Sequence, residues 1–578
     1  MPGYGLKIAA VLTSTICSLA PLPAHACGGF FCTTFPISQV SERILFVQGS
    51  GTVTTHVQIQ YSGRPEDFAW ILPVPTLPEL TVSHNELFRQ LELSTQPSFV
   101  LDFEGEENCF FFPPFIRFTD AVAEAGGVEI VAEEQVGPFD TVIITGDDPQ
   151  AVANWLQENG YLLDGIGIDL LAPYVNNGFH FVALKLAPNK DVGDLQPIAL
   201  SYAADRPGIP IQLTAIATEP DLGVIAWVLA ENRAIPENYL HVEINEAKID
   251  WLNGGQNYQA LVAEAANEAG GNAFTTDYAG SSDIMADRVY RAGQYDLDRL
   301  RATTDPVAYL DELLRQGFPR DTQTQSLIRR HIPMPSEVLT DGVLHVVYRG
   351  DLDAYSRAQE DGTLPAIADQ SFYNNMAAYA EWTGSLLFSP TEMTDDIEVT
   401  IVTPLQESQQ LFTDNPYLTR LFTTLSANEM TVDPMFAYNP DLPEVPAVRR
   451  ATARCECPEG VDPDSIKIED KTIVITLSDG REIRVNPDPG PIPFPFDPLP
   501  LPSATIVQRL TTSGPAETIR TLTAINSDFN DDGETTQDDL PDFISVFGKS
   551  APRYDLDGDG VIGFGDFLRF VEAVNAAG

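Results

Sequence analysis

The sequence has few basic residues for its length. Its 578 residues include 33 Lys and Arg against 83 Asp and Glu, a formal net charge of −50. Nucleic acids and anionic lipid surfaces attract proteins mainly through Lys and Arg, so this balance argues against both as partners. It suits a salty or calcium-containing medium, in which cations screen the carboxylates.

Long apolar runs are missing after the first residues, so no transmembrane segment is expected in the mature chain. Lys7, an apolar stretch at 8–20 and Ala24-His25-Ala26 predict a secretory signal peptide over residues 1–26. The protein is therefore expected to be secreted, with the cell surface or the periplasm as its other locations. A lipid anchor at Cys27 is the less favoured alternative, because Ala24 stands where lipoproteins usually have Leu.

Familiar catalytic motifs are absent as well. The sequence contains no G-x-S-x-G, no H-E-x-x-H and no phosphate-binding glycine loop. Its histidines after residue 26 show no ligand spacing: His56, His84, His180, His241, His331 and His345. A Ser/His/Asp or paired-carboxylate site assembled only in the folded chain stays open. No catalytic residue is assigned, and a protein without enzymatic activity is favoured.

Cysteines are few. Five remain after the signal peptide: Cys27, Cys32, Cys109, Cys455 and Cys457. Export favours disulfides, and the odd number leaves one cysteine over. Cys455 and Cys457 are too close to bond each other without strain, so we expect them to pair with the N-terminal cysteines. Residues 27–457 would then form one closed body. A thiolate metal site is the minor alternative.

The body has the patterns of an α+β fold. Runs rich in β-branched and aromatic residues predict strands at 42–47, 52–61, 67–72, 141–145, 179–186, 211–217, 224–229, 239–244, 343–348 and 397–402. Cap and stop signals predict helices over 83–91, from Asp147 or Asp148 to 159, and over 257–269, 305–317 and 372–382, the first with a capping box from Ser83 to Glu86. Strands outnumber helices and do not alternate strictly with them, which favours a strand-rich α+β body of one or two subdomains. His56, on an alternating strand, is expected at the surface.

Several short motifs carry a resemblance. They are CGGFFC at 27–32, ERILF at 42–46, HVQIQY at 56–61, DFAW at 67–70 and ILPVP at 71–75. Together they resemble the opening of a secreted bacterial family, domain-of-unknown-function family 2330 (DUF2330). Weaker similarities at 155–161, 171–175, 181–186 and 273–279 extend the resemblance to about residue 400. It implies export and a shared fold, but no activity and no catalytic residue.

Three further segments follow the body. Residues 458–485 predict a small β-hairpin module that turns at Ser478-Asp479-Gly480. Residues 486–503 are a proline-rich linker, a semi-rigid spacer that would hold the tail away from the body. Residues 504–578 form the predicted tail domain.

The tail contains two loops, DFNDDGETTQDD at 528–539 and DLDGDGVIGFGD at 555–566. Each has oxygen-bearing side chains at positions 1, 3, 5 and 12 and glycine at position 6, the pattern of a calcium loop. We therefore predict two Ca²⁺ sites. The predicted ligands are Asp528, Asn530, Asp532, Glu534 (carbonyl), Thr536 and Asp539 in loop one, and Asp555, Asp557, Asp559, Val561 (carbonyl) and Asp566 in loop two.

Each loop is followed by a similar helical segment, with Phe543 matching Phe570 and Ile544 matching Val571. Gly548 and Pro552 leave no room for a helix entering loop two, so the tail resembles a dockerin-type pair of EF-hand-like loop–helix units. The sequence thus indicates a secreted or cell-surface protein with a calcium-dependent docking module for a protein partner. The alternative is a secreted hydrolase that carries the tail as a targeting appendage.

Overall fold

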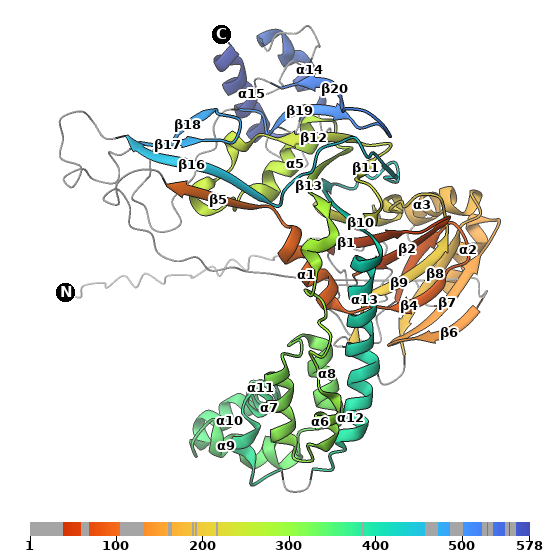
Figure 1. Cartoon of the computed structure of the whole chain (residues 1–578), viewed down its shortest axis with the longest axis vertical. Helices are drawn as coiled ribbons and strands as arrows, with labels where there is room; N and C mark the ends of the chain where they lie inside the picture. Colours follow the sequence, from red (N-terminus) through yellow and green to blue (C-terminus); the bar gives the residue numbers. More distant parts are fainter. Residues whose placement is uncertain are drawn as a thin grey trace, which may run out of the picture.

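A ten-stranded sheet runs through the middle of the molecule (Figure 1). Its strand order is β20 (Glu517–Thr521), β19 (Ala504–Arg509), β12 (Leu240–Ile244), β13 (Ala273–Ser281), β14 (Tyr417–Leu425), β10 (Thr218–Ala230), β1 (Gln39–Gln48), β2 (Thr52–Val57), β9 (Ile198–Ala203) and β4 (Glu79–Val82). This computed structural model describes residues 39–58, 69–103, 132–159, 165–187, 190, 194–215, 218–383, 386–456, 472–485, 501–522, 529, 536–549, 554, 556 and 562–577.

The centre of the sheet is covered on both faces. In β10, Val224, Ala226 and Val228 point into one core cluster, whereas Ile225, Trp227 and Leu229 point into another. A strand buried on both faces needs apolar side chains in both directions, which explains the continuous apolar run that predicted this strand. β10 pairs with β1 in parallel and with β14 in antiparallel orientation.

Two four-stranded sheets flank the large one (Figure 1). The first has the order β3 (Ala69–Val74), β8 (His180–Leu186), β7 (Phe139–Thr145), β6 (Ala132–Val136), and it packs with α2 (Pro149–Glu158) and α3 (Gly165–Asn176) in one core cluster. The second has the order β18 (Glu482–Val485), β17 (Thr472–Thr476), β16 (Val448–Glu456), β5 (Ser98–Phe103). β11 (Ala234–Pro236) and β15 (Phe436–Tyr438) form a separate pair. The mixed α+β class predicted for the body is confirmed.

A helical arm lies between β13 and β14 in the sequence and extends away from the sheets in Figure 1. It comprises α6 (Leu297–Ala302), α7 (Pro306–Gln316), α8 (Thr322–His331), α9 (Val343–Val346), α10 (Leu352–Glu360), α11 (Leu364–Asn374), α12 (Pro390–Ile397) and α13 (Thr403–Asp414). The cap signals predicted α7 correctly: Asp305 is its N-cap, and Gly317 ends it with a φ of 75°.

Three predicted strands are wrong. Residues 211–217 begin with the short helix α4 (Ile211–Thr214), residues 343–348 contain α9, and residues 397–402 form a π-helical turn between α12 and α13. The β-branched runs at these places fill helical cores, so tertiary packing overrides their β preference. In the π turn the Thr400 carbonyl accepts from the side-chain amides of Gln196 (3.1 Å) and Gln323 (3.0 Å), which ties the helix to the body.

The start of α1 (Asn85–Thr95) also differs from the prediction. Its N-cap is His84, whose Nδ1 accepts from the backbone N–H of Glu86 at 3.1 Å, so the capping box from Ser83 is not formed. The predicted helix at 257–269 is confirmed as α5 (Tyr258–Glu268), and of the two caps expected for α2, Asp147 or Asp148, the structure has Asp148. Residues 372–382 are the end of α11 and a 3₁₀ turn at Met376–Tyr379.

The C-terminal segments are joined to the body more closely than the sequence indicated. The hairpin β17–β18 exists, but β17 also pairs with β16, so the hairpin belongs to a larger sheet. β19 pairs with β12 and β20 with β19, so residues 504–521 extend the large sheet rather than the compact tail. The compact tail itself contains α14 (Leu540–Val546) and α15 (Phe564–Ala577).

Candidate metal centre and buried polar clusters

The tail has a small aromatic core of its own. Phe529, Phe543, Ile562 and Phe570 are buried together, and the rings of Phe543 and Phe570 stack with centroids 5.6 Å apart and planes at 8°. These two phenylalanines occupy equivalent positions of the two repeats, as the sequence predicted. The repeats therefore pack face to face around shared apolar residues, which brings the two loops into one small unit.

The last residue of each loop closes that loop in the same way. Asp539 accepts from the backbone N–H of Phe529 at 2.6 Å through Oδ1 and from that of Thr536 at 2.8 Å through Oδ2. Asp566 accepts from Leu556 at 2.6 Å and from Gly563 at 2.6 Å. Both aspartates are fully buried, at 0% exposure. Loop positions 2 and 9 are thus joined to position 12 in both repeats.

This arrangement fits a calcium ion. A carboxylate buried this deeply is costly unless charge or hydrogen bonds compensate it. Ca²⁺ takes several carboxylate and carbonyl oxygens at one centre. An ion bound at each loop would compensate the charge of the buried aspartate that closes that loop.

Most predicted ligands lie outside the described residues: Asp528, Asn530, Asp532, Glu534, Asp555, Asp557, Asp559 and Val561. Of the others, Thr536 caps a short 3₁₀ turn, and its hydroxyl accepts from the backbone N–H of Asp538 at 3.1 Å. Among the side chains that the structure describes, no group of three or more His, Cys, Asp or Glu is placed to hold a metal ion. The calcium sites therefore stay a prediction.

Ile562, at the position that pairs the loops in such domains, is fully buried. Its backbone N–H donates to the Lys549 carbonyl at 3.0 Å, and its carbonyl accepts from Gly548 at 2.8 Å. Loop two is thus held against the segment that follows α14. Thr535, the equivalent residue of loop one, lies outside the described residues.

The tail also exposes large apolar side chains. Their exposed fractions are Ile544 59%, Phe547 49%, Phe564 68%, Leu568 49% and Val571 36%. Ile544 and Val571 are equivalent positions of the two repeats, so both exit helices present an apolar residue to solvent. Clusters of exposed apolar residues commonly mark protein–protein contact sites.

In the body, a buried charged cluster surrounds Asp277. This residue lies at an irregularity of β13, where the register to β14 shifts between Thr276 and Tyr278. Its Oδ1 accepts from the Tyr258 hydroxyl at 2.5 Å, and its Oδ2 lies 3.0 Å from Nε of Arg420. Arg420 also contacts Glu92 at 2.9 Å. Burial raises the pKa of Asp277 and of Tyr258, whereas the two carboxylates hold the pKa of Arg420 above its usual value.

Asp277 and Glu92 both contact Arg420, so this cluster is a place to look for the paired-carboxylate site that the sequence left open. However, Asp277 is 0% exposed and Arg420 3% exposed, and of the two carboxylates only Glu92 reaches solvent, with its side chain 20% exposed. A β-bulge turns the Asp277 side chain toward Arg420. The cluster is a buried ionic network. The sequence could have indicated it only through Asp277, the single acidic residue among residues 273–279.

A second polar cluster anchors the chain where it re-enters the fold after the proline-rich segment. Ser503 is fully buried and bonds Lys248 at 2.7 Å, and its hydroxyl also donates to Glu264. The backbone N–H groups of Ser503 and Ala504 donate to the two carboxylate oxygens of Glu268 at 2.9 and 2.8 Å. Burial raises the pKa of Glu268 to about 7.

The same cluster meets the tail. Arg569 on α15 lies 3.4 Å from the second carboxylate oxygen of Glu264. One glutamate on α5 therefore contacts the body, the re-entry point and the tail. The proline-rich segment was expected to hold the tail away from the body, but Arg569 of the tail contacts Glu264 of the body.

The histidines occupy structural positions. His56 was expected at the surface, but it is 6% exposed, and burial lowers its pKa to about 4. His241 bonds the Thr276 hydroxyl at 2.9 Å, and burial together with Arg233 lowers its pKa to about 3. Thr55, His56 and Val57 are all buried, because the sheet is covered on both faces here, so the polar position is buried too.

The cysteine predictions cannot be followed in detail. Cys27, Cys32, Cys109 and Cys457 lie outside the described residues. The backbone of Cys455 lies in β16, which runs parallel to β5 and pairs Ala453 with Phe103. Disulfide pairing stays a prediction.

Comparison with known proteins identifies one similarity. Residues 22–290 match the model of a family described as "Uncharacterized protein conserved in bacteria (DUF2330)". No curated protein and no solved structure matches the chain. Within the described residues, no helix is long and apolar enough to cross a membrane. The match ends before the helical arm, so it extends less far than the resemblance to about residue 400. Over residues 22–290 the chain is thus similar to a bacterial family that is itself uncharacterised.

Proposed function

We propose that this is an exported bacterial protein, secreted or held at the cell surface, whose tail binds two Ca²⁺ ions and docks on a protein partner. The observation that carries the proposal is the repeated clamp: Asp539 and Asp566 are both fully buried, and each holds its own loop through two backbone N–H groups. The signal-like N-terminus and the acidic composition support an extracellular, calcium-containing setting.

Docking is supported by the surface of the tail. The core of the unit already buries Phe543 and Phe570, yet Ile544, Phe564 and Leu568 remain exposed on the same two helices. Burying these side chains against an apolar partner surface would stabilise the complex by about 25 cal/mol for each Å² of apolar surface removed from water. Calcium would act indirectly, by neutralising the loop carboxylates and fixing the start of each exit helix.

A pull-down tests this proposal. The bait is the full mature chain, because residues 504–521 are strands of the body's sheet, and the prey is surface extract of the producing bacterium, with calcium or with chelator. We expect a partner that is retained only with calcium and is lost with the double variant Ile544→Ser and Leu568→Ser. The matched control is Leu352→Ser, which removes an equally exposed apolar side chain from the helical arm. Docking would be contradicted if the partner were retained equally with calcium and with chelator, and equally by the parent chain and the tail double variant.

The alternative, a secreted hydrolase with the tail as a targeting appendage, has less support. Of the carboxylates that converge in the described part of the body, Asp277 and Glu92 are held by the buried Arg420, Glu264 is held by Lys248 and Ser503, and Glu268 accepts from the backbone N–H groups of Ser503 and Ala504. Activity against a panel of ester, glycoside and peptide substrates would favour it, especially if the activity survived chelation of calcium.

A further inference from the structure

The helical arm meets the body along α8. At the start of this helix, Oδ2 of its N-cap Asp321 lies 3.6 Å from Nε2 of His84, which is in the turn between β4 and α1. At its other end, Arg330 pairs with Asp194 of the body. Figure 1 shows the rest of the arm extending away from the sheets beyond this helix. The contact of His84 with Asp321 is therefore part of a joint between two parts of the molecule.

A π-helical turn lies at the same joint. Residues 390–414 form α12, the π turn Glu398–Val402 and α13 without a break. In Figure 1, α12 belongs to the arm and α13 runs beside the body. The Thr400 carbonyl in this turn accepts from the side-chain amides of Gln196 in the body and Gln323 in α8. Helices bend at π turns, so this turn offers a pivot for the arm.

Several buried polar atoms at the arm joint have no hydrogen-bond partner within the described residues. They are Oγ of Ser83, Nε2 of His84, Oε1 of Gln323 and Oγ1 of Thr324. Buried polar atoms are normally paired, and an unsatisfied one destabilises the state that buries it. Water would satisfy these atoms once the joint opened, so opening here costs less than at an apolar contact.

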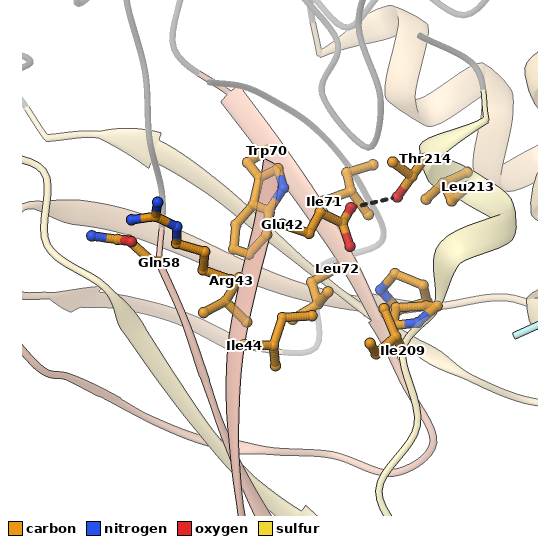
Figure 2. Close-up of a pocket in the computed structure, with 13 residues that line it drawn as sticks. Glu42, Arg43, Ile44, Gln58, Trp70, Ile71, Leu72, Ile209, Leu213 and Thr214 are labelled. Atoms are coloured by element: carbon orange, nitrogen blue, oxygen red, sulfur yellow. Dashed lines mark hydrogen bonds between the residues drawn. The ribbon is translucent and has the colours of Figure 1, made fainter. Parts of the chain in front are cut away.

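A small hollow beside Glu42, between β1 and the turn that contains α4, is a different kind of site (Figure 2). There Glu42 accepts from the Thr214 hydroxyl at 2.7 Å, and Arg43 lines the same hollow. The residues that line it all belong to the body. The unsatisfied atoms of the arm joint instead come from both the body and the arm, so they can separate when the arm moves.

His84 is the titratable group at the centre of the joint, and it is fully buried. Its Nδ1 accepts the backbone N–H of Glu86, so the proton of the neutral ring lies on Nε2, which faces Asp321. A second proton would have to go on Nδ1, where it would face the N–H of Glu86 and remove the N-cap of α1. The neutral ring therefore fits the closed joint, and the imidazolium does not.

The charged groups around His84 do not remove this conflict. The acidic groups that act on it are Asp321 on α8 and Glu86 on α1, and Glu86 is itself paired with Arg89. Burial lowers the pKa of His84, and these two carboxylates offset the effect only in part. An exposed histidine has a pKa near 6.5. The closed joint is therefore fully stabilised above about pH 6.5, and that stabilisation is lost as the pH falls.

We propose that the arm joint is an acid-sensitive hinge: protonation of His84 separates the start of α1 from the start of α8, and the arm pivots about the π turn at 398–402. The hinge gives the arm two positions relative to the body, and the pH selects between them. It involves the body and the arm alone, so the proposal does not depend on calcium binding by the tail.

Hydrogen–deuterium exchange of the full mature chain at pH 7 and pH 5 tests the hinge, with mass spectrometry as the readout. The rates are corrected for the intrinsic effect of pH on exchange. We expect amides in α1 and α8 to exchange about ten- to thirtyfold faster at pH 5, because each pH unit below about 6.5 favours the open joint by up to about tenfold. Amides in β10, at the centre of the large sheet, should not change.

His84→Asn is the decisive variant. An Asn side chain can accept the Glu86 N–H, so it keeps the cap of α1 but takes up no proton. Its α1 and α8 amides should exchange equally at both pH values. The matched control is His345→Asn, in an exposed pair with Asp341 far along the arm, which should respond to acid like the parent chain.

A second variant keeps the test decisive if His84→Asn does not fold. Asp321→Asn retains a capping side chain for α8 but removes the charge that faces His84, so it should open more than the parent chain at pH 5. The hinge would be overturned by equal exchange of the parent chain at both pH values, by an unchanged acid response of His84→Asn, or by less opening of Asp321→Asn. Acid exchange that rises as much in β10 as in α1 would mean global unfolding and would also overturn it.

Discussion

At the residue scale, buried histidines make the body sensitive to acid. His56 and His241 lie in β2 and β12, and burial lowers their pKa values to about 4 and about 3. Both rings are neutral in the folded protein at pH values where an unfolded histidine, with a pKa near 6.5, takes up a proton. Their contribution to stability is therefore complete above about pH 6.5 and is lost as the pH falls toward the folded values.

We predict that His56→Leu weakens this acid sensitivity. The free energy of unfolding of the parent chain should fall between pH 7 and pH 4, with His56 responsible for up to about 3 kcal/mol of the loss. Urea unfolding at several pH values measures the slope for parent and variant. The control is His345→Leu, in the helical arm, whose side chain is 58% exposed. Identical slopes for His56→Leu and the parent would contradict the prediction.

At the element scale, the irregularity in β13 determines how the large sheet is joined to α1 and α5. It places Asp277 against Arg420 of β14, and Arg420 reaches Glu92 of α1 while its guanidinium lies 5.3 Å from the Trp227 ring centroid. Tyr258 of α5 completes the network through its bond to Asp277. The network around Arg420 thus joins β13, β14, α1 and α5. Loss of either carboxylate would leave the buried guanidinium with only one anionic partner in this network.

Asp277→Asn is therefore expected to destabilise the body strongly, by about 3–5 kcal/mol, the cost of breaking a buried ion pair from one side. Arg509→Gln breaks the exposed pair with Glu517 and should cost less than about 1 kcal/mol. Thermal unfolding followed by circular dichroism compares the two variants. Similar melting temperatures for both would show that the Asp277 network does not stabilise the fold.

At the scale of the whole molecule, the chain after residue 500 returns to the body through strand β19 and again through the tail helix α15. The first return is at Ser503, held by Lys248 and Glu268, where β19 begins and extends the large sheet. The second is the contact of Arg569 with Glu264. This pair is partly exposed, at 33% for Arg569 and 17% for Glu264, so solvent screens it and it contributes about 1 kcal/mol or less; the tail is therefore expected to unfold separately from the body.

Calorimetry tests this expectation together with the proposed calcium sites. Chelator should lower the unfolding temperature of a small tail transition and leave the large body transition in place. Calcium at one hundred times its dissociation constant would stabilise the tail by about 3 kcal/mol. The double variant Asp539→Ala and Asp566→Ala should behave as if chelated, with or without calcium. A single transition that calcium does not move would contradict the two-site proposal.

The sequence by itself determined the features that depend on local chemistry. The cap residues Asp148 and Asp305, the stop at Gly317 and the hairpin turn at 478–480 have the same roles in the structure, because each acts through its own backbone neighbours. The loop repeat in the tail follows from the same cause, since position 12 clamps residues of its own loop.

Only the tertiary structure decided what depends on distant partners. The β-branched run at 397–402 is helical because it is packed in the core of the arm, and His56 is buried because both faces of the sheet are covered. Strand order, the placement of β19 beside β12, the Asp277–Arg420 pair and the hollow beside Glu42 all join residues far apart in the chain. Periodicity and spacing report on neighbours within a few residues, and so could not place these groups together.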